Sequence, residues 1–380
     1  MTQPPPPFAK SDLDETDAAK PDVGVDQWRK IPRRTLTIAL SVLPIVALAN
    51  VGVLIWSLGG IDLSESIVAP GLLGLVALLV FVPMIGNSIR LALWARFLGL
   101  EIGFLGSLKV ITGTMVTNSV TPSATGGAPI KLLFLIGEGV ESRRALTLIS
   151  FQAGEDTLAT LTILGFCLTF TGFAMFDFVS SDPEMLDELN QTIQSASLIA
   201  LWSLLGVAVL ALLIVCGLLG GRVRSWFGKA SRKLRSFFKQ IVGDWQVAFK
   251  RGKWIAAINL GLALLQWGIR FSIAGLVLAA FGVEWQPAVF WMLQYFVQSI
   301  SALIPTPGGA GGAEAGFLLL FRPFVSVETL FPAMSTWRLM FFYLPLIGAA
   351  MTFFLLHRRS RARAAANPDG QESSVPAPAE

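Results

Sequence analysis

Long apolar segments are the feature of this sequence that most restricts its fold. A helix needs about 20 apolar residues to cross the hydrocarbon core of a bilayer. The chain is 53% hydrophobic and only 14% charged, against about 25% charged in soluble domains. We therefore predict an all-α integral membrane protein with about six transmembrane helices. The segments that meet the required length are 36–58, 67–89, 145–176, 195–219, 254–281 and 329–356.

Two further apolar stretches are interrupted by proline and glycine. Residues 104–140 contain TPSATGGAP at Thr121–Pro129, and residues 287–321 contain PTPGGAGGAE at Pro305–Glu314. The apolar piece after each interruption reaches a charged residue before the roughly 17 residues that a crossing needs. Irregular backbone persists at membrane depth only inside protein or against a wet cavity. We therefore predict two re-entrant helical hairpins within the bundle.

Lysine and arginine mark the predicted cytoplasmic side. Six of them precede the first segment, ten lie between Arg222 and Lys253 against a single acid, and four follow His357. The loops at 59–66 and 177–194 contain none. Because cytoplasmic loops are enriched in basic residues, we expect both ends of the chain to be cytoplasmic.

This topology divides the chain into a membrane domain at 35–357 and two disordered cytoplasmic tails at 1–34 and 358–380. The basic segment 221–253 interleaves cations with tryptophan and phenylalanine. That pattern is typical of an amphipathic helix on an anionic membrane surface. A solvated loop that only sets the topology is the alternative, and the sequence leaves both open.

A short motif occurs in both interrupted stretches. Gly-Gly-Ala at 126–128 matches Gly-Gly-Ala at 311–313, and an apolar run follows each copy. The first copy follows a predicted outward-to-inward helix, and the second follows an inward-to-outward helix. Units of opposite orientation are typical of transporters whose site lies near the midplane, where discontinuous helices meet. We predict an inverted repeat with units at about 67–176 and 254–356.

Residues needed for several chemistries are absent or misplaced. The only histidine, His357, follows the last apolar segment, which excludes histidine triads and imidazole metal sites. Cys167 and Cys216 lie in apolar runs and are expected to pack rather than form a disulfide. The basic blocks border membrane segments, so no nucleic acid partner is expected. We expect no catalytic residues, cofactor or metal, although a metal site built from carboxylates alone is not excluded.

Several charged residues fall within or near the predicted membrane depth. Each would cost about 2.5–3.5 kcal/mol if it faced lipid at a helix centre, so most are expected to face the protein interior. One interpretation is that they pair with one another and lock the bundle, for example Glu155 or Asp156 with Arg338. The other gives them a role in binding substrate or carrying protons. The residues concerned are Lys131, Glu155, Asp156, Arg270, Glu314 and Arg338.

The two hairpin tips are the predicted substrate site. Glycines permit close approach of the backbone, and a short helix that begins at depth presents N–H groups and a positive dipole end to an anion. This arrangement suits a lipid phosphate, with Lys131 as an added cation and Glu314 as a counter-charge for an amine headgroup. The alternative is that small residues only allow tight helix packing. The other candidate residues are Thr121, Pro122, Ser123, Thr125, Gly126, Gly127, Gln298, Pro305, Thr306, Pro307, Gly308, Gly309, Gly311 and Gly312.

Three motifs carry a resemblance to a known family. They are TPSATGGAPIK at Thr121–Lys131, LIPTPGGAGGAE at Leu303–Glu314 and WRLMFFYLPLIGA at Trp337–Ala349. Together with Glu155-Asp156 they resemble the membrane domain of the lysylphosphatidylglycerol synthase/flippase family, over residues 35–357. The resemblance implies a multi-pass protein of the bacterial cytoplasmic membrane that handles lipid. Some relatives move a modified phospholipid between leaflets, and others serve envelope or polyisoprenoid lipid pathways.

The sequence departs from the family pattern in two places. Many relatives have Glu-Arg after the first hairpin, whereas this chain has Glu155-Asp156, so a local ion pair is expected to be missing. No soluble aminoacyl-transfer domain follows the last helix, so we do not expect this polypeptide to synthesise lipid.

The working hypothesis is a flippase or transporter for a phospholipid or a polyisoprenoid-linked substrate, with membrane lipids of anionic or zwitterionic headgroup as partners. The P-loop pattern for ATP does not occur, so a gradient or downhill movement would drive transport. One alternative is a membrane transferase with Glu155 or Asp156 as base or metal ligand. Another is a non-transporting scaffold in envelope lipid biogenesis. The sequence also leaves open a homo-oligomer or an envelope-biogenesis partner.

Overall fold

A computed structural model describes residues 68–119, 127–172, 242–248, 250–304, 306 and 308–366. All regular secondary structure within these residues is helical, which confirms the predicted all-α class. The predicted membrane segments 36–58 and 195–219 lie outside the described residues, as do the tail 1–34 and most of the basic segment 221–253.

Three helical stretches in the described part are long and apolar enough to cross a membrane. They are Pro70–Phe97, with α4 (Pro70–Leu79) and α5 (Val82–Phe97); α12 (Lys253–Ala280); and Val327–Arg359, with α15 (Val327–Arg338), the π-helix η3 (Leu339–Tyr343) and most of α16 (Leu344–Ala366). A fourth predicted crossing, α8 (Ser142–Thr171), has 30 residues and so a length of about 45 Å. It carries Glu155 and Asp156 at its middle, which makes it more polar than the other three.

Each interrupted stretch forms a pair of short helices that pack together. The first pair is α6 (Phe104–Asn118) and α7 (Gly127–Gly137), and the second is α13 (Pro287–Leu303) and α14 (Gly312–Phe321). The longest of the four, α13, has 17 residues and is about 25 Å long. A bilayer core is about 30 Å thick, so none of the four can cross it as a straight perpendicular helix.

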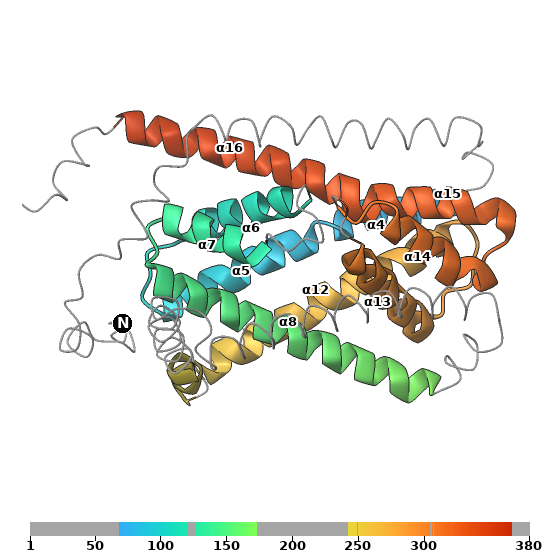
Figure 1. Ribbon diagram of the computed structural model, residues 1–380, viewed down its shortest axis with the longest axis horizontal. Coiled ribbons are helices and arrows are strands. Elements are labelled where there is room, and N and C mark those ends of the chain that lie inside the picture. Colours follow the sequence, from blue (N-terminus) through green and yellow to red (C-terminus); the bar gives the residue numbers. More distant parts are fainter. Residues whose placement is uncertain are drawn as a thin grey trace, which may run out of the picture.

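The two helix pairs enter the bundle from opposite ends (Figure 1). Asn118 and Ser119, at the end of α6, line the same cavity as Gly308 and Gly309 in the turn between α13 and α14. The tips of the two pairs therefore meet inside the molecule, which supports opposed hairpins. That each pair returns to the membrane face from which it entered stays a prediction.

One end of the bundle is rich in basic residues. α5 and α16 end there, and α8 and α12 begin there (Figure 1). Arg96 lies in the last turn of α5, Arg143 in the first turn of α8, and Lys253 begins α12. At the opposite end, the described segment between α14 and α15 contributes Arg322, and the first turn of α15 contributes Glu328. That the basic end faces the cytoplasm stays a prediction. At the same basic end α16 continues to Ala366, past the predicted tail boundary at residue 357.

Two apolar clusters hold the described part of the bundle. One is formed mainly by α12, α13, α14 and α15 and includes Phe290 and Phe317. The other is formed mainly by α5, α6, α7 and α8 and includes Trp94 and Phe151. Phe81, between α4 and α5, packs against both clusters. Each cluster thus comes mainly from one half of the chain, but Ile163 and Cys167 of α8 join the first cluster, and Leu346 and Ala349 of α16 join the second. α16 from the second half also packs along α6 from the first.

The outer faces of α8 and α16 are apolar. Leu161 and Phe170 on α8 are exposed, as are Met351 and Phe354 on α16. A soluble protein rarely leaves such large contiguous apolar faces in water. These faces are therefore suited to contact with lipid or with another membrane helix.

Gly113 tests the packing of α6 against α7 and α16. A Cβ at this position would lie 2.7 Å from the ring of Phe134 on α7 and 2.8 Å from the ring of Phe353 on α16. We expect Gly113→Ala to lower the free energy of unfolding by about 1–3 kcal/mol through overpacking. Gly165→Ala on α8, with no atom within 4 Å of its Cβ, is the control and should be neutral or stabilising. Denaturant unfolding of the purified protein in detergent, followed by circular dichroism, measures both. Equal midpoints for the two variants would contradict the close contact.

Candidate functional site

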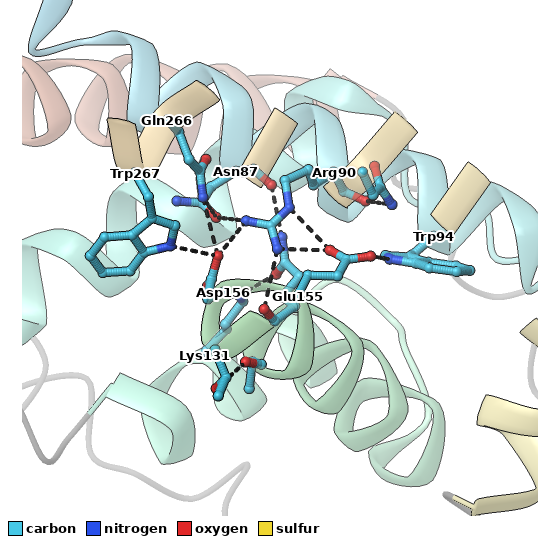
Figure 2. A network of polar contacts seen from close by, with 12 residues as sticks. Asn87, Arg90, Trp94, Lys131, Glu155, Asp156, Gln266 and Trp267 are labelled. Atoms are coloured by element: carbon cyan, nitrogen blue, oxygen red, sulfur yellow. Dashed lines mark hydrogen bonds and ion pairs between the residues drawn. The ribbon is translucent and has the colours of Figure 1, made fainter. Parts of the chain in front are cut away.

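A buried cluster of charges lies where α5, α7, α8 and α12 meet. Its centre is Arg90 on α5, whose side chain is fully enclosed. Arg90 Nη2 lies 2.7 Å from Glu155 Oε2, and Arg90 Nη1 lies 2.6 Å from Asp156 Oδ1. Adjacent side chains on a helix point about 100° apart, but the planar fork of a guanidinium is wide enough to reach both carboxylates. Figure 2 shows Arg90 between the two acids.

Indole and amide donors complete the coordination of the two carboxylates. Trp94 Nε1 donates to Glu155 Oε1 at 2.6 Å. On α12, Trp267 Nε1 and Gln266 Nε2 donate to Asp156 Oδ1 at 3.1 Å and 3.2 Å (Figure 2). The cluster therefore ties α8 both to α5 and to the first long helix of the second half.

Lys131 joins the same cluster from α7. Its Nζ donates to Gln152 Oε1 on α8. Gln152 Nε2 in turn donates to the backbone carbonyl of Asn87 at 3.0 Å, and Arg90 Nη1 donates to Asn87 Oδ1 at 3.2 Å. Lys131 is thus engaged with the protein, not placed alone at a hairpin tip.

The cluster is electrically balanced, with Arg90 and Lys131 against Glu155 and Asp156. A buried charge is tolerated when it is paired and its remaining hydrogen bonds are satisfied. The expectation of a missing ion pair after the first hairpin is corrected here, because Arg90 on α5 supplies the cation from 65 positions away. The suggested pairing of Glu155 or Asp156 with Arg338 is wrong, since α8 faces α5 and Arg338 binds a different acid.

Arg338, at the end of α15, binds the second hairpin. Its Nε lies 2.8 Å from Glu314 Oε1, an ion pair whose angle falls outside hydrogen-bond geometry. Its Nη2 donates to the carbonyl of Gly308 at 2.8 Å, and its guanidinium carbon lies 4.4 Å from the ring centroid of Phe342. The arginine thus holds the turn between α13 and α14 against η3.

Glu314 has a second structural role. Its Oε2 accepts the backbone N–H of Gly311, at 2.7 Å, where α14 begins. This carboxylate is therefore occupied by a helix start and by Arg338. The expectation of an unpaired N–H is corrected here, because Glu314 itself satisfies the N–H of Gly311 at this helix start. A role of Glu314 as counter-charge for an amine headgroup stays a prediction.

The turn between α13 and α14 requires glycine for backbone and packing reasons. Gly308 and Gly309 have φ of 63° and 66°, in the left-handed region that favours glycine. A Cβ at Gly308 would overlap the ring of Phe342, and one at Gly309 would overlap the hydroxyl of Ser301. The turn is also closed by Thr306 Oγ1, which donates to the carbonyl of Ala310 at 2.7 Å. The tight-packing interpretation therefore accounts for these two glycines.

A cavity of about 330 Å³ lies between the two hairpin tips. The first half of the chain contributes the end of α6 and the junction of α4 and α5, and the second half contributes α12, α13, the glycine turn and parts of α14, α15, η3 and α16. Its polar side chains are those of Asn118, Ser119, Arg270, Gln298, Ser301 and Arg338, and its apolar wall includes Met115, Ile269, Trp337, Phe341 and Phe342.

Irregular backbone forms one wall of this cavity. The helix that contains Arg338 widens into the π-helix η3 over Leu339–Tyr343. Pro345 follows and has no N–H to donate to the carbonyl of Phe341, four residues earlier, so a regular α-helix cannot continue there. Single π-helical turns are frequent at functional sites. Phe341 and Phe342 lie within this turn and face the cavity.

The structure separates the predicted site residues that it describes into three groups. Arg270, Gln298, Gly308, Gly309 and Arg338 line the cavity. Lys131, Glu155 and Asp156 belong to the Arg90 cluster, whereas Gly127, Thr306, Gly311, Gly312 and Glu314 support the hairpins without lining the cavity. Thr121, Pro122, Ser123, Thr125, Gly126, Pro305 and Pro307 lie outside the described residues.

Arg90 is the functional residue that sequence reasoning missed. The predicted helix ended at residue 89 because arginine is rare inside membrane helices. A usable signal was present: Asn87, Arg90 and Trp94 follow a helical spacing of three and four, which places their side chains on one face. A continuous helix to Phe97 would have turned that face toward the interior.

We expect Arg90→Met to destabilise the protein by about 3–5 kcal/mol, because it leaves two buried carboxylates without their cation. Arg96→Met, at an exposed position on the same helix, should change stability by less than about 0.5 kcal/mol. Adding Glu155→Gln and Asp156→Asn to Arg90→Met should recover much of the loss. Urea unfolding in detergent measures all three, and equal stability of the two arginine variants would show that the cluster does not hold the bundle.

Comparison with known proteins places the chain in a family. The sequence profile of the lysylphosphatidylglycerol synthase transmembrane region matches residues 36–349. A UPF0104 membrane protein of Archaeoglobus fulgidus is 25% identical over 272 residues, covering 70% of this chain and 80% of the relative. A second UPF0104 membrane protein, from Methanothermobacter thermautotrophicus, is 22% identical over 316 residues, covering 78% and 88%. The profile spans most of the chain and includes both hairpins and the helix with Arg338, so the protein belongs to the lysylphosphatidylglycerol synthase transmembrane-region family.

Proposed function

We propose that the protein moves a phospholipid or polyisoprenoid-linked lipid between the leaflets of the cytoplasmic membrane. The observation that carries this proposal is the cavity where the tips of two opposed helix pairs meet, which is lined by both polar and apolar side chains. Discontinuous helices that meet at a midplane site are typical of transporters with inverted repeats. Membership of a lipid-handling family supports the choice of lipid as substrate.

The size of the cavity supports a headgroup as its occupant. Small-molecule sites usually enclose about 300–1,000 Å³, and this cavity of about 330 Å³ is at the lower limit. Two acyl chains would not fit in addition to a headgroup. In the proposed mechanism the headgroup enters the cavity while the chains stay in the surrounding lipid.

The two halves provide the parts that would move against each other. Each contributes most of the residues of one apolar cluster. On the cavity wall, the left-handed glycines of the second hairpin and the π-helix are the places where backbone departs from regular helix. In the proposed cycle these segments adjust as one half tilts against the other, which exposes the headgroup to each face in turn. The basic end of the bundle would face the cytoplasm.

Filling the cavity tests this function. Ala302 on α13 lines the cavity, whereas Ala315 on α14 is exposed elsewhere on the same hairpin. In proteoliposomes with a fluorescently labelled phospholipid and an external quencher, we expect Ala302→Trp to slow translocation at least tenfold. Ala315→Trp should keep the wild-type rate. Both variants are checked for a monodisperse elution profile in detergent.

Two outcomes would contradict lipid transport. One is a wild-type rate no faster than that of protein-free vesicles, across anionic and zwitterionic labelled lipids. The other is an equal rate for the two tryptophan variants, because the cavity would then lie outside the path of the headgroup.

A further inference from the structure

Arg270 has no anionic partner of its own within the described residues. Its Nε donates to the neutral Gln298 Oε1 at 2.9 Å. Its guanidinium carbon lies 4.9 Å from the ring centroid of Phe341 and 5.6 Å from that of Trp267. Its two terminal nitrogens make no hydrogen bond to the part of the chain that the structure describes. A cation held by one amide and two aromatic rings is positioned but not neutralised.

The nearby carboxylates already have cations. Asp156, which acts on Arg270 electrostatically, is held by Arg90 at 2.6 Å. Glu314 is held by Arg338 at 2.8 Å. The cavity lining contains no aspartate or glutamate among the described residues. Residues 120–126, next to the tip of α6, have no acid in their sequence either. The cavity therefore carries an excess positive charge.

A second group in the cavity wall also lacks an acceptor. Trp337 lines the cavity, and its indole Nε1 is buried with no hydrogen-bond partner in the described structure. Buried donors without partners are costly and uncommon in native proteins. The Trp337 N–H is enclosed within the wall, so Arg270 is the donor that a ligand in the cavity can approach. Its complement is a ligand group that accepts hydrogen bonds.

The two halves of the protein differ in how they neutralise the arginine that precedes each hairpin. In the first half, Arg90 precedes the hairpin, and the helix after the hairpin supplies Glu155 and Asp156 to neutralise it. In the second half, Arg270 precedes the hairpin, and the helix after it supplies another arginine, Arg338. The first half closes its charge balance internally, whereas the second leaves one cation for a ligand.

We propose that Arg270 binds the phosphate of a net anionic lipid headgroup in this cavity, and that headgroups carrying an ammonium are excluded. Guanidinium binds phosphate oxygens through two parallel charged hydrogen bonds. An ammonium would meet two arginines and no unoccupied carboxylate, and that repulsion creates selectivity. This inference rests on the proposed lipid transport and names its substrate class.

The binding test uses the full-length protein in an uncharged detergent. Fluorescent phosphatidylglycerol is displaced by unlabelled phosphatidylglycerol, phosphatidylcholine and lysyl-phosphatidylglycerol with the same acyl chains. Glycerol 3-phosphate and inorganic phosphate are separate competitors. We expect phosphatidylglycerol to bind at least tenfold more tightly than the two lipids that carry an ammonium.

Two variants assign the binding to Arg270. Arg270→Gln removes the cation, and Gln298→Glu places a carboxylate beside it that neutralises it within the protein. Because Gln298→Glu adds an ion pair inside the protein, a loss of binding in this variant is not explained by unfolding. Each should weaken phosphatidylglycerol binding at least tenfold, as expected for loss of a charged hydrogen bond. Arg322→Gln, at an exposed position, removes the same charge elsewhere and should stay within twofold of wild type.

Equal binding of the three lipids, or unchanged affinity in Arg270→Gln and Gln298→Glu, would overturn the proposal. Competition by inorganic phosphate or glycerol 3-phosphate as strong as that by the lipid would keep the anion site but overturn its assignment to a lipid. Selective binding without translocation would contradict transport and leave the anion site standing. Translocation that Ala302→Trp blocks, but that depends neither on the headgroup nor on Arg270, would support transport and overturn the anion site.

Discussion

The Arg90 guanidinium, enclosed between Glu155 and Asp156, is the interaction on which the first half of the bundle depends. With Lys131, these residues bring four charges to membrane depth, and the charges are stable only as a unit because any one of them facing lipid alone would be costly. The unit also requires α5 and α8 to lie together, and Trp267 from α12 completes it. In a soluble protein, apolar burial determines which helices pack together. Here the polar contacts of the Arg90 cluster have that role.

The second half has a different polar centre, which lies at the cavity. Arg338 holds the glycine turn through the carbonyl of Gly308 and pairs with Glu314. The backbone around the turn is irregular, and irregular backbone at membrane depth needs a polar or protein surrounding. The cavity supplies that surrounding. A half with a neutral charge cluster next to a half with an unneutralised Arg270 is an asymmetric pair, although both have the same order of helices.

The outcome of prediction differed between elements for physical reasons. The segment 254–281 matched α12 (Lys253–Ala280) closely, because an uninterrupted apolar run has no competing interpretation. The segment 67–89 stopped short of Phe97, because Arg90 and Arg96 resembled the end of a crossing. Only the acids on α8 make an arginine tolerable inside that helix. The depth of Arg270 and Arg338 was predictable from hydropathy, but their partners were not.

By itself, the sequence determined the all-helical membrane class, the two interrupted stretches and the set of charges that must avoid lipid. These follow from composition along the chain, since a bilayer accepts few backbone arrangements. Only the tertiary structure decided which charged residues form ion pairs. Arg90 and Glu155 are 65 positions apart, and an ion pair is a property of distance in space. The same packing placed Arg270 beside a neutral glutamine, and so determined where the positive charge is left unmatched.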